Sequence, residues 1–435
     1  MVILGGGYTG MWTAYFLTEH APGIDVVILE QDICGGGPSG RNGGFVLGWW
    51  DELPGLVKLY GEDPALEACR ALSRSVRGIG EWCRAHDVDA WFMPGGELNV
   101  STSAAQDEGA DAAVELARRL GVDDEYVPLS PEQVQVRCRS PVFRGGAFMR
   151  DGATVQPARL ARGLRRVLLE RGVRIFEGTA ALSFRTGPPA EAATDGGGVR
   201  AGQAIVALNA WAAGWKEFRR GLVTWGSYIV LTEPAPEQLA DIGWTGGECI
   251  VDFRTALHYL RTTPDGRIAV GGGGARAGYD GRIGRRFTHD ALSASRAAQG
   301  FRRLFPSFSD VLLEDAWGGP IDVSGSHLPY FGTLVPGNVH FGHGYTGNGV
   351  APSHLGGQTL ASLALGRDDD VTRLPMVGHR PVRFPPEPLK YLGAYVIREA
   401  IVRKERAEDE GQRPNGALRF LAGLPRRFGY LLGPE

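Results

Sequence analysis

The sequence lacks the features that direct a chain to a membrane or to a nucleic acid. Its 435 residues carry a net charge of −3, so no overall attraction to a polyanion is expected. No apolar run approaches the roughly 20 residues that span a bilayer, and the first residues form no basic-then-apolar signal segment. We therefore expect neither a nucleic-acid partner nor a transmembrane segment.

Paired cysteines are also lacking. The five cysteines include no C-x-x-C pair, and an odd number of scattered thiols fits a reducing compartment better than a disulfide framework. The cytoplasm is the simplest location. We predict no metal site.

What the chain does have begins with an alternation of strands and helices. Hydrophobic residues at 43% and charged residues at 22% are typical of a globular protein, and the length suggests two or three domains. The first residues predict a strand at Val2–Leu4, a glycine turn at Gly5–Gly10, a helix at Tyr8–His20 and a strand at Asp25–Glu30. Only four residues precede the first glycine, so we expect a few native residues to precede this numbering.

Apolar periodicity predicts further elements along the chain. They are helices at Pro64–His86, near Ala104–Leu120 and at Ala158–Arg171, strands at Val173–Glu177 and Gln203–Leu208, an antiparallel meander at Ser227–Thr232, Glu248–Asp252, Leu257–Thr262 and Arg267–Gly271, a strand near Asn338–Phe341, and helices at Ala351–Leu365 and Leu389–Val402. The predicted fold class is mixed α/β. A nucleotide domain (1–45, 153–215 and 325–385) is interleaved with a substrate domain (46–152 and 216–324), and a helical extension follows (386–435).

The glycine turn has the spacing of a dinucleotide-binding fingerprint. Gly5, Gly7 and Gly10 form G-x-G-x-x-G between a strand and a helix, which lets backbone amides approach a pyrophosphate. Glu30 ends the second strand, where a carboxylate can accept hydrogen bonds from ribose hydroxyls. That charge repels a 2′-phosphate, so FAD or NAD is favoured over NADP. The alternative is a chance turn in a chain with 65 glycines.

The segment Gly37–Phe45 resembles the S-G-R-N-G-G loop of the D-amino-acid oxidase superfamily, and it looks most like the γ-glutamylputrescine oxidoreductase branch. The resemblance implies that the cofactor is FAD. The residues that it places against FAD are Ser39, Gly40, Arg41, Asn42, Gly43 and Gly44. Positions 38–45 hold neither His nor Cys, so we predict non-covalent FAD, although Cys34 is nearby.

A second segment, Gly342–Gly349, is similar to the family's C-terminal flavin loop, which precedes its last long helix. Amides at that helix N-terminus can stabilise negative charge on the reduced flavin. The resemblance covers about residues 1–385 and implies a Rossmann-type FAD-binding domain beside an antiparallel-sheet substrate domain. The predicted cofactor site gains Tyr8, Thr9, Gln31, Ala181, Gly344, Thr346, Gly347, Asn348 and Gly349.

In this family, amine oxidation moves a hydride from the carbon beside nitrogen to flavin N5, so a neutral amine must be held near N5 in a dry pocket. The catalytic candidates are Tyr259, Trp317, Tyr345 and His343, and the substrate candidates are Trp49, Trp50, Asp252, Arg261 and Gly318. Asp252 could attract a polyamine, and Arg261 could hold an anionic group. Structural alternatives stay open: core packing for Trp49 and Trp50, a brace of the glycine loop for His343, and a surface ion pair for Arg254.

Two absent residues limit the range of possible substrates and electron acceptors. Amino-acid oxidases of the superfamily place an arginine for the α-carboxylate in the stretch that matches Trp317–Ile321, where this chain has none. Sarcosine-type oxidases place a lysine over the flavin to activate O2, yet no lysine lies in the meander. We predict oxidation of a small primary or secondary amine to an imine, which water hydrolyses to an aldehyde and an amine, with O2 or another electron acceptor.

Other functions stay open. The same pocket could take an amino acid, an aminophosphonate, an N-hydroxylated compound or a hydroxy acid. A flavin-binding partner protein is least favoured, although the amphipathic and basic tail after Pro385 suggests it. The tail also leaves open a homodimer.

Overall fold

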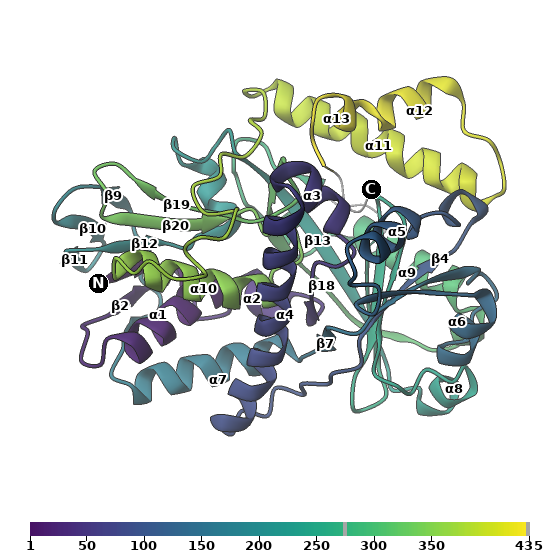
Figure 1. The fold of residues 1–435 in the computed structure, drawn as a ribbon, viewed down its shortest axis with the longest axis horizontal. Helices are drawn as coiled ribbons and strands as arrows, with labels where there is room; N and C mark the ends of the chain where they lie inside the picture. The colour runs from purple at the N-terminus through teal and green to yellow at the C-terminus, as the bar shows by residue number, and fades with distance from the viewer. Residues whose placement is uncertain (273–275, 432–435) are drawn as a thin grey trace.

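The computed structural model describes residues 1–272 and 276–431, with a parallel sheet at one end and a larger mixed sheet at the other (Figure 1). The strands of the first sheet, in order across it, are β19 (Tyr330–Leu334), β20 (Val339–His343), β12 (Ala204–Val206), β1 (Val2–Leu4), β2 (Val27–Leu29) and β8 (Arg174–Phe176). All neighbours pair in parallel except β19 with β20. Segments from distant parts of the chain thus form one sheet, as the interleaved prediction requires.

Helices cover one face of this parallel sheet. They are α1 (Tyr8–His20), α7 (Pro157–Glu170) and α10 (Val350–Ala364), and all three lie within one residue of the predicted bounds. The helices α1 and α10 pack closely, because a Cβ on Gly357 would lie 2.4 Å from the Cβ of Trp12. A small antiparallel sheet covers the other face, and its strands are β9 (Ser183–Arg185), β10 (Ala190–Thr194) and β11 (Gly197–Ala201).

The second sheet contains the predicted antiparallel strands. Its order is β17 (Arg276–Ala277), β13 (Leu222–Thr232), β16 (Ile268–Gly272), β15 (His258–Thr262), β14 (Cys249–Asp252), β4 (Glu97–Ser101), β6 (Gly145–Met149) and β5 (Tyr126–Leu129), with β18 (Leu313–Ser324) also paired to β13. The meander prediction was wrong in one respect: β13 pairs with β16 rather than with β14. Instead β14 pairs in parallel with β4.

The strands β4, β5 and β6 were not predicted. Between them the sequence indicated only a helix near 104–120, whereas the structure has a short 3-10 turn at Ala104–Gln106 and α5 at Asp111–Arg119. The sequence of β4, ELNVS, has polar residues at every other position, and β6 begins with two glycines. The alternation in β4 has the period of a strand, but it is short and contains Glu and Asn, which are rare in strands, and glycine weakens the signal in β6. Every residue of β4 is buried.

The remaining elements connect the two sheets and extend the chain. They are α2 (Pro38–Arg41), β3 (Phe45–Leu47), α3 (Leu53–Tyr60), α4 (Glu62–Ala85), α6 (Pro131–Arg137), β7 (Gly152–Thr154), α8 (Pro236–Asp241), α9 (Ala291–Leu304), α11 (Leu389–Asp409), α12 (Gly416–Ala422) and α13 (Leu424–Arg427). The mixed α/β class and the helical tail are confirmed, and residues 432–435 of the predicted extension lie outside the described residues. The domain boundaries stay a prediction. Within the described ranges, no helix has the length and apolarity needed to cross a bilayer.

Candidate active site

The turn between β1 and α1 allows strand and helix to approach closely. A Cβ on Gly10 would lie 2.0 Å from the carbonyl oxygen of Gly5, so no other residue fits there. Helix α1 begins after Gly7 with no side-chain cap and no acidic residue in its first turn. The positive end of the helix dipole is therefore available to an anionic group.

Glu30 lies beside this turn, just after β2. One carboxylate oxygen accepts the N–H of Gly6 at 2.8 Å, and the other accepts the N–H of Asp32 at 2.9 Å. Burial raises the pKa of Glu30 despite these two bonds. Cys34 is also here: burial raises the pKa of its thiol to about 12, so the thiol is neutral. Glu30 is thus held in place by backbone donors at the end of the strand.

Hydrogen bonds bring the three predicted cofactor segments together. The N–H of Tyr8 donates to Ser39 Oγ at 2.9 Å, which joins the start of α1 to the loop 39–44. Thr9 Oγ1 donates to the hydroxyl of Tyr345 at 2.9 Å, which joins the same turn of α1 to the loop 344–349. The structure thus brings these distant segments together, and their contact with the cofactor stays a prediction.

Asn42 shapes the loop 39–44. Its amide nitrogen donates to the carbonyls of Pro38 and Ser39 at 3.1 and 2.8 Å, and its amide oxygen accepts the N–H of Gly44 at 2.7 Å. Gly44 has φ +81°, and a Cβ there would lie 2.0 Å from the carbonyl oxygen of Val155. The conformation of this loop therefore depends on its side-chain amide and its glycine.

Asp322 organises the second loop, and the sequence had given it no role. This fully buried carboxylate on β18 accepts the N–H groups of Gly344 at 2.6 Å and Tyr345 at 3.2 Å, and the amide of Asn209 at 2.8 Å. Burial raises its pKa to about 7. The only signal in the sequence was an acidic residue between the apolar Ile321 and Val323 near the end of a strand.

The second sheet contacts the loop 39–44 through three predicted residues. Arg261 Nε donates to the carbonyl of Gly43, and Trp317 Nε1 donates to the carbonyl of Arg41 at 2.8 Å. The ring of Tyr259 packs edge-on against Phe45, with centroids 5.4 Å apart. Burial lowers the pKa of Arg261 to about 10 and raises that of Tyr259 to about 12.

Other predicted residues lie apart from this contact. His343 packs among Phe218, Phe341 and Tyr330 on the far face of the parallel sheet, and burial lowers its pKa to about 3. Tyr345 points into the helix packing, where it meets Phe331. The geometry favours the brace interpretation for His343.

Trp49, Trp50 and Gly318 are likewise enclosed by protein. Both tryptophans are buried, and Trp50 Nε1 donates to Ser73 Oγ at 3.1 Å. A Cβ on Gly318 would lie 2.5 Å from the ring of Tyr228. Gln31 is exposed after β2, and Ala181 packs partly buried against the apolar core of the parallel sheet.

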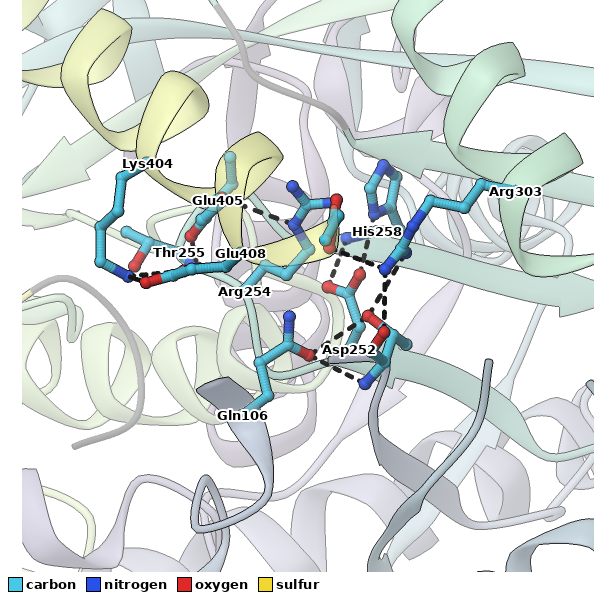
Figure 2. A network of polar contacts seen from close by, with 12 residues as sticks. Gln106, Asp252, Arg254, Thr255, His258, Arg303, Lys404, Glu405 and Glu408 are labelled. Atoms are coloured by element: carbon cyan, nitrogen blue, oxygen red, sulfur yellow. Dashed lines mark hydrogen bonds and ion pairs between the residues drawn. The ribbon is translucent and has the colours of Figure 1, made fainter. Parts of the chain in front are cut away.

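Asp252 and Arg254 belong to a separate polar network, shown in Figure 2. Asp252 accepts the backbone N–H of His258 at 2.8 Å and contacts its ring Nδ1 at 2.8 Å. Arg254 pairs with Asp409 at 2.9 Å and with Glu405 at 3.5 Å, both on α11. The expected surface ion pair of Arg254 is thus a buried one, since its side chain is only 9% exposed.

These features suit an adenine dinucleotide with a flavin ring. The glycine cradle and the uncapped start of α1 suit a pyrophosphate, and Glu30 suits a ribose. Helix α10 also begins without a side-chain cap or an acidic residue. The side-chain oxygen of Asn348, in the adjoining loop, is buried without a hydrogen-bond partner among the described residues, so it can accept a ring N–H. Fold and site together define the class of dinucleotide-binding flavoproteins.

Comparison with known proteins narrows this class to one family. Residues 1–363 match the family described as DAO, FAD dependent oxidoreductase, and the chain belongs to it. It is 30% identical over 393 residues to γ-glutamylputrescine oxidoreductase of Escherichia coli (strain K12), covering 88% of this chain and 89% of that protein. The predictions of the family, of an oxidoreductase and of FAD as cofactor are therefore confirmed.

Solved structures agree on the fold. Glycine oxidase from Geobacillus kaustophilus gives a TM-score of 0.70 at 18% identity, covering 87% of this chain and 98% of that one. L-proline dehydrogenase from P. horikoshii gives 0.69 at 19% identity, covering 86% and 94%. At this identity the likeness supports the fold alone.

Proposed function

We propose that this chain oxidises a small primary or secondary amine and holds FAD without a covalent bond. Bound FAD would supply, at its N5, the acceptor for a hydride from the carbon beside the amine nitrogen. Water would hydrolyse the resulting imine to an aldehyde and, from a primary amine, ammonia, or, from a secondary amine, the remaining amine. O2 or another acceptor then takes the two electrons. The relationship to γ-glutamylputrescine oxidoreductase supports an amine as the substrate.

The cofactor would be held by the three segments that meet at α1. The turn 5–10 would receive the pyrophosphate, Glu30 the ribose, and the loops 39–44 and 344–349 the ring system. Among the described residues, the guanidinium of Arg41 forms no ion pair, so its charge is available to the cofactor. The start of α10 would stabilise negative charge on the reduced ring.

One observation carries the choice of an amine: the sheet face that touches the loop 39–44 is aromatic. Tyr259 and Trp317 lie there, and Arg261 on the same face donates to the carbonyl of Gly43. An aromatic, water-poor surface attracts an ammonium by cation–π interaction and lowers its pKa, which favours the neutral amine that the reaction needs. Tyr259 and Trp317 would therefore orient the substrate.

The test is anaerobic mixing of the FAD-loaded protein with a panel of amines while flavin absorbance is recorded. Amines should bleach the oxidised flavin band, and dithionite serves as the control for a reducible cofactor. Failure of every amine to bleach a dithionite-reducible flavin would remove the proposal.

A second candidate substrate is an amino acid. Arg261 is a buried cation on the site-facing surface, and its remaining N–H groups could hold a carboxylate. The same bleaching experiment with amino acids and with the matching decarboxylated amines separates the two. The cytoplasm as compartment and a homodimer as assembly stay predictions.

A further inference from the structure

Two acidic side chains with buried, unpartnered oxygen atoms face the candidate site from a direction that the sequence did not suggest. Val251 on β14 lies opposite both Tyr259 on β15 and Asn99 on β4. Glu97 is two residues before Asn99, so it points to the same face of the sheet as Tyr259. That face contacts the loop 39–44, as Tyr259 and Arg261 show.

Asp51 approaches the same place from the other side. It follows β3 and the two tryptophans, seven residues after Gly44, and its negative charge acts on Glu97. Its Oδ1 is buried. Asp51 and Glu97 thus come from separate segments. Asp51 lies after the loop 39–44 and β3, and Glu97 lies on β4 of the second sheet.

In the described parts of the chain, neither acid is paired with a lysine or an arginine, although the charge of His327 acts on Asp51. Glu97 is 2% exposed, and its Oε2 has no hydrogen-bond partner in the described parts of the chain. Asp51 Oδ1 is likewise unpartnered there. The third acid nearby, Glu52, contacts His327 at 3.2 Å, but no lysine or arginine of the described chain forms an ion pair with Asp51 or Glu97.

Such an arrangement is costly in free energy. Burial raises the pKa of both Asp51 and Glu97. Repulsion from Glu52 adds to the rise for Asp51, and repulsion from Asp51 adds to the rise for Glu97. An ionised carboxylate without a partner is strongly disfavoured in a protein interior. A cation that enters from outside would offset this cost, which is a reason to find such acids beside a binding site.

We infer that Asp51 and Glu97 form an anionic subsite for the distal ammonium group of a linear diamine or polyamine. The inference rests on the proposed function, because the other nitrogen of the substrate is the one oxidised at the flavin. Strands β15 and β4 are two strand spacings apart, about 10 Å. A linear aliphatic diamine or polyamine can bridge such a distance, with its methylene groups against the aromatic face.

The test compares 1,5-diaminopentane with n-pentylamine, which differ only in the distal ammonium. Anaerobic flavin reduction in the FAD-loaded wild-type protein should reach half-saturation at a diamine concentration at least tenfold below that of the monoamine. Glu97→Gln and Asp51→Asn should bring this ratio close to one while changing the limiting rate less than threefold. The diamine should also raise the Tm of the wild-type protein but not of Glu97→Gln.

Glu405→Gln is the matched control, because Glu405 is a buried acid on α11 in the separate network. Any damage from it should affect both amines alike and leave the ratio unchanged. Equal half-saturation of the wild-type protein by the two amines, or a ratio that survives both Glu97→Gln and Asp51→Asn, would overturn the subsite. Bleaching by the monoamine in that case would leave the proposed function standing, whereas bleaching by neither amine would remove it. Flavin content and circular dichroism identify a variant that fails to fold.

Discussion

Buried or half-buried acidic side chains lie against both faces of the second sheet, and their surroundings differ. On the face toward the loop 39–44, Asp51 and Glu97 form no ion pair with a lysine or arginine among the described residues, and each has an oxygen without a hydrogen-bond partner there. On the opposite face, Glu405 and Asp409 are paired with Arg254. Asp252 is on that face as well, since it alternates with Val251 along β14.

The paired face is held by many contacts, which Figure 2 shows. Glu405 accepts the N–H of Thr255 at 2.7 Å, and Arg303 on α9 donates to Asp409 at 2.7 Å and to the carbonyl of Thr102 at 2.8 Å. These bonds tie α11 to the turn between β14 and β15, the strand that carries Tyr259. We conclude that the paired acids fix the tail and the sheet, whereas the unpaired acids are kept for a ligand.

Removing the cation of the paired cluster should have the largest effect. In Arg254→Met, Glu405 and Asp409 lose a counter-charge, so the free energy of unfolding should fall by about 3–5 kcal/mol at pH 8. Burial raises the pKa of both acids, although the charge of Arg254 acts in the opposite direction. The loss should therefore shrink toward pH 5, where the acids become protonated. Urea unfolding at the two pH values measures it.

The control for this variant is Arg403→Met, which removes an exposed pair with Glu399 on the same helix. Its cost should not exceed about 0.5 kcal/mol. If Arg254→Met cost less than about 1 kcal/mol at pH 8, the paired cluster would not be what fastens α11.

Asp322 is an intermediate case, because it lacks a cation but accepts three N–H donors. Asp322→Ala leaves the N–H groups of Gly344 and Tyr345 buried without an acceptor, so we expect a loss of about 2–3 kcal/mol in stability. FAD should bind about tenfold more weakly, about 1.4 kcal/mol, because the loop 344–349 loses its anchor.

Asp322→Asn is the milder companion, since its amide oxygen can still accept one of these bonds. A fluorescence titration of the apoprotein with FAD ranks the variants. Unchanged FAD affinity in Asp322→Ala would mean that the loop does not hold the cofactor.

The sequence predicted well the parts of the site that depend on local pattern. The turn Gly5–Gly10 and helix α1 follow from spacing within one segment, and the structure has them as predicted. Glu97 could not be found in this way, because its role depends on the face to which β4 turns it. The same alternation explains why Asp252 does not lie beside Tyr259. Asp252 follows Val251 by one residue, so its side chain points to the opposite face of the sheet.

Removing one unpaired acid should change the free energy of unfolding in the opposite direction to Arg254→Met. The raised pKa of Glu97 means that the folded protein loses stability as pH rises from the ordinary carboxylate range through the folded pKa. Glu97→Gln should therefore be more stable than the wild-type protein by about 1–2 kcal/mol at pH 8 and nearly equal at pH 5. Urea unfolding of the ligand-free proteins at the two pH values measures this difference.

Asp107→Asn provides the contrast, because hydrogen bonds from Arg144 lower the pKa of Asp107. This variant should lose stability at pH 8 rather than gain it. A loss in Glu97→Gln at pH 8 would show that the carboxylate makes a structural contribution, and the contrast between the two faces would fail.

The smallest effect should come from His343, a buried group that is unpartnered in the described structure but uncharged. With its pKa lowered to about 3 by burial, the ring is neutral at pH 8, so His343→Phe should change stability by less than about 1 kcal/mol there. Near pH 5 the wild-type protein loses stability because the buried ring must stay neutral, so the variant should be the more stable of the two.

The limiting rate of flavin reduction in His343→Phe should stay within twofold of the wild-type rate. A fall of about a hundredfold, as when a general acid or base is lost, would instead return His343 to the catalytic site. His340→Phe should cost more stability than His343→Phe, because it removes two side-chain hydrogen bonds, to Thr333 and Gln203, whereas His343 makes none among the described residues.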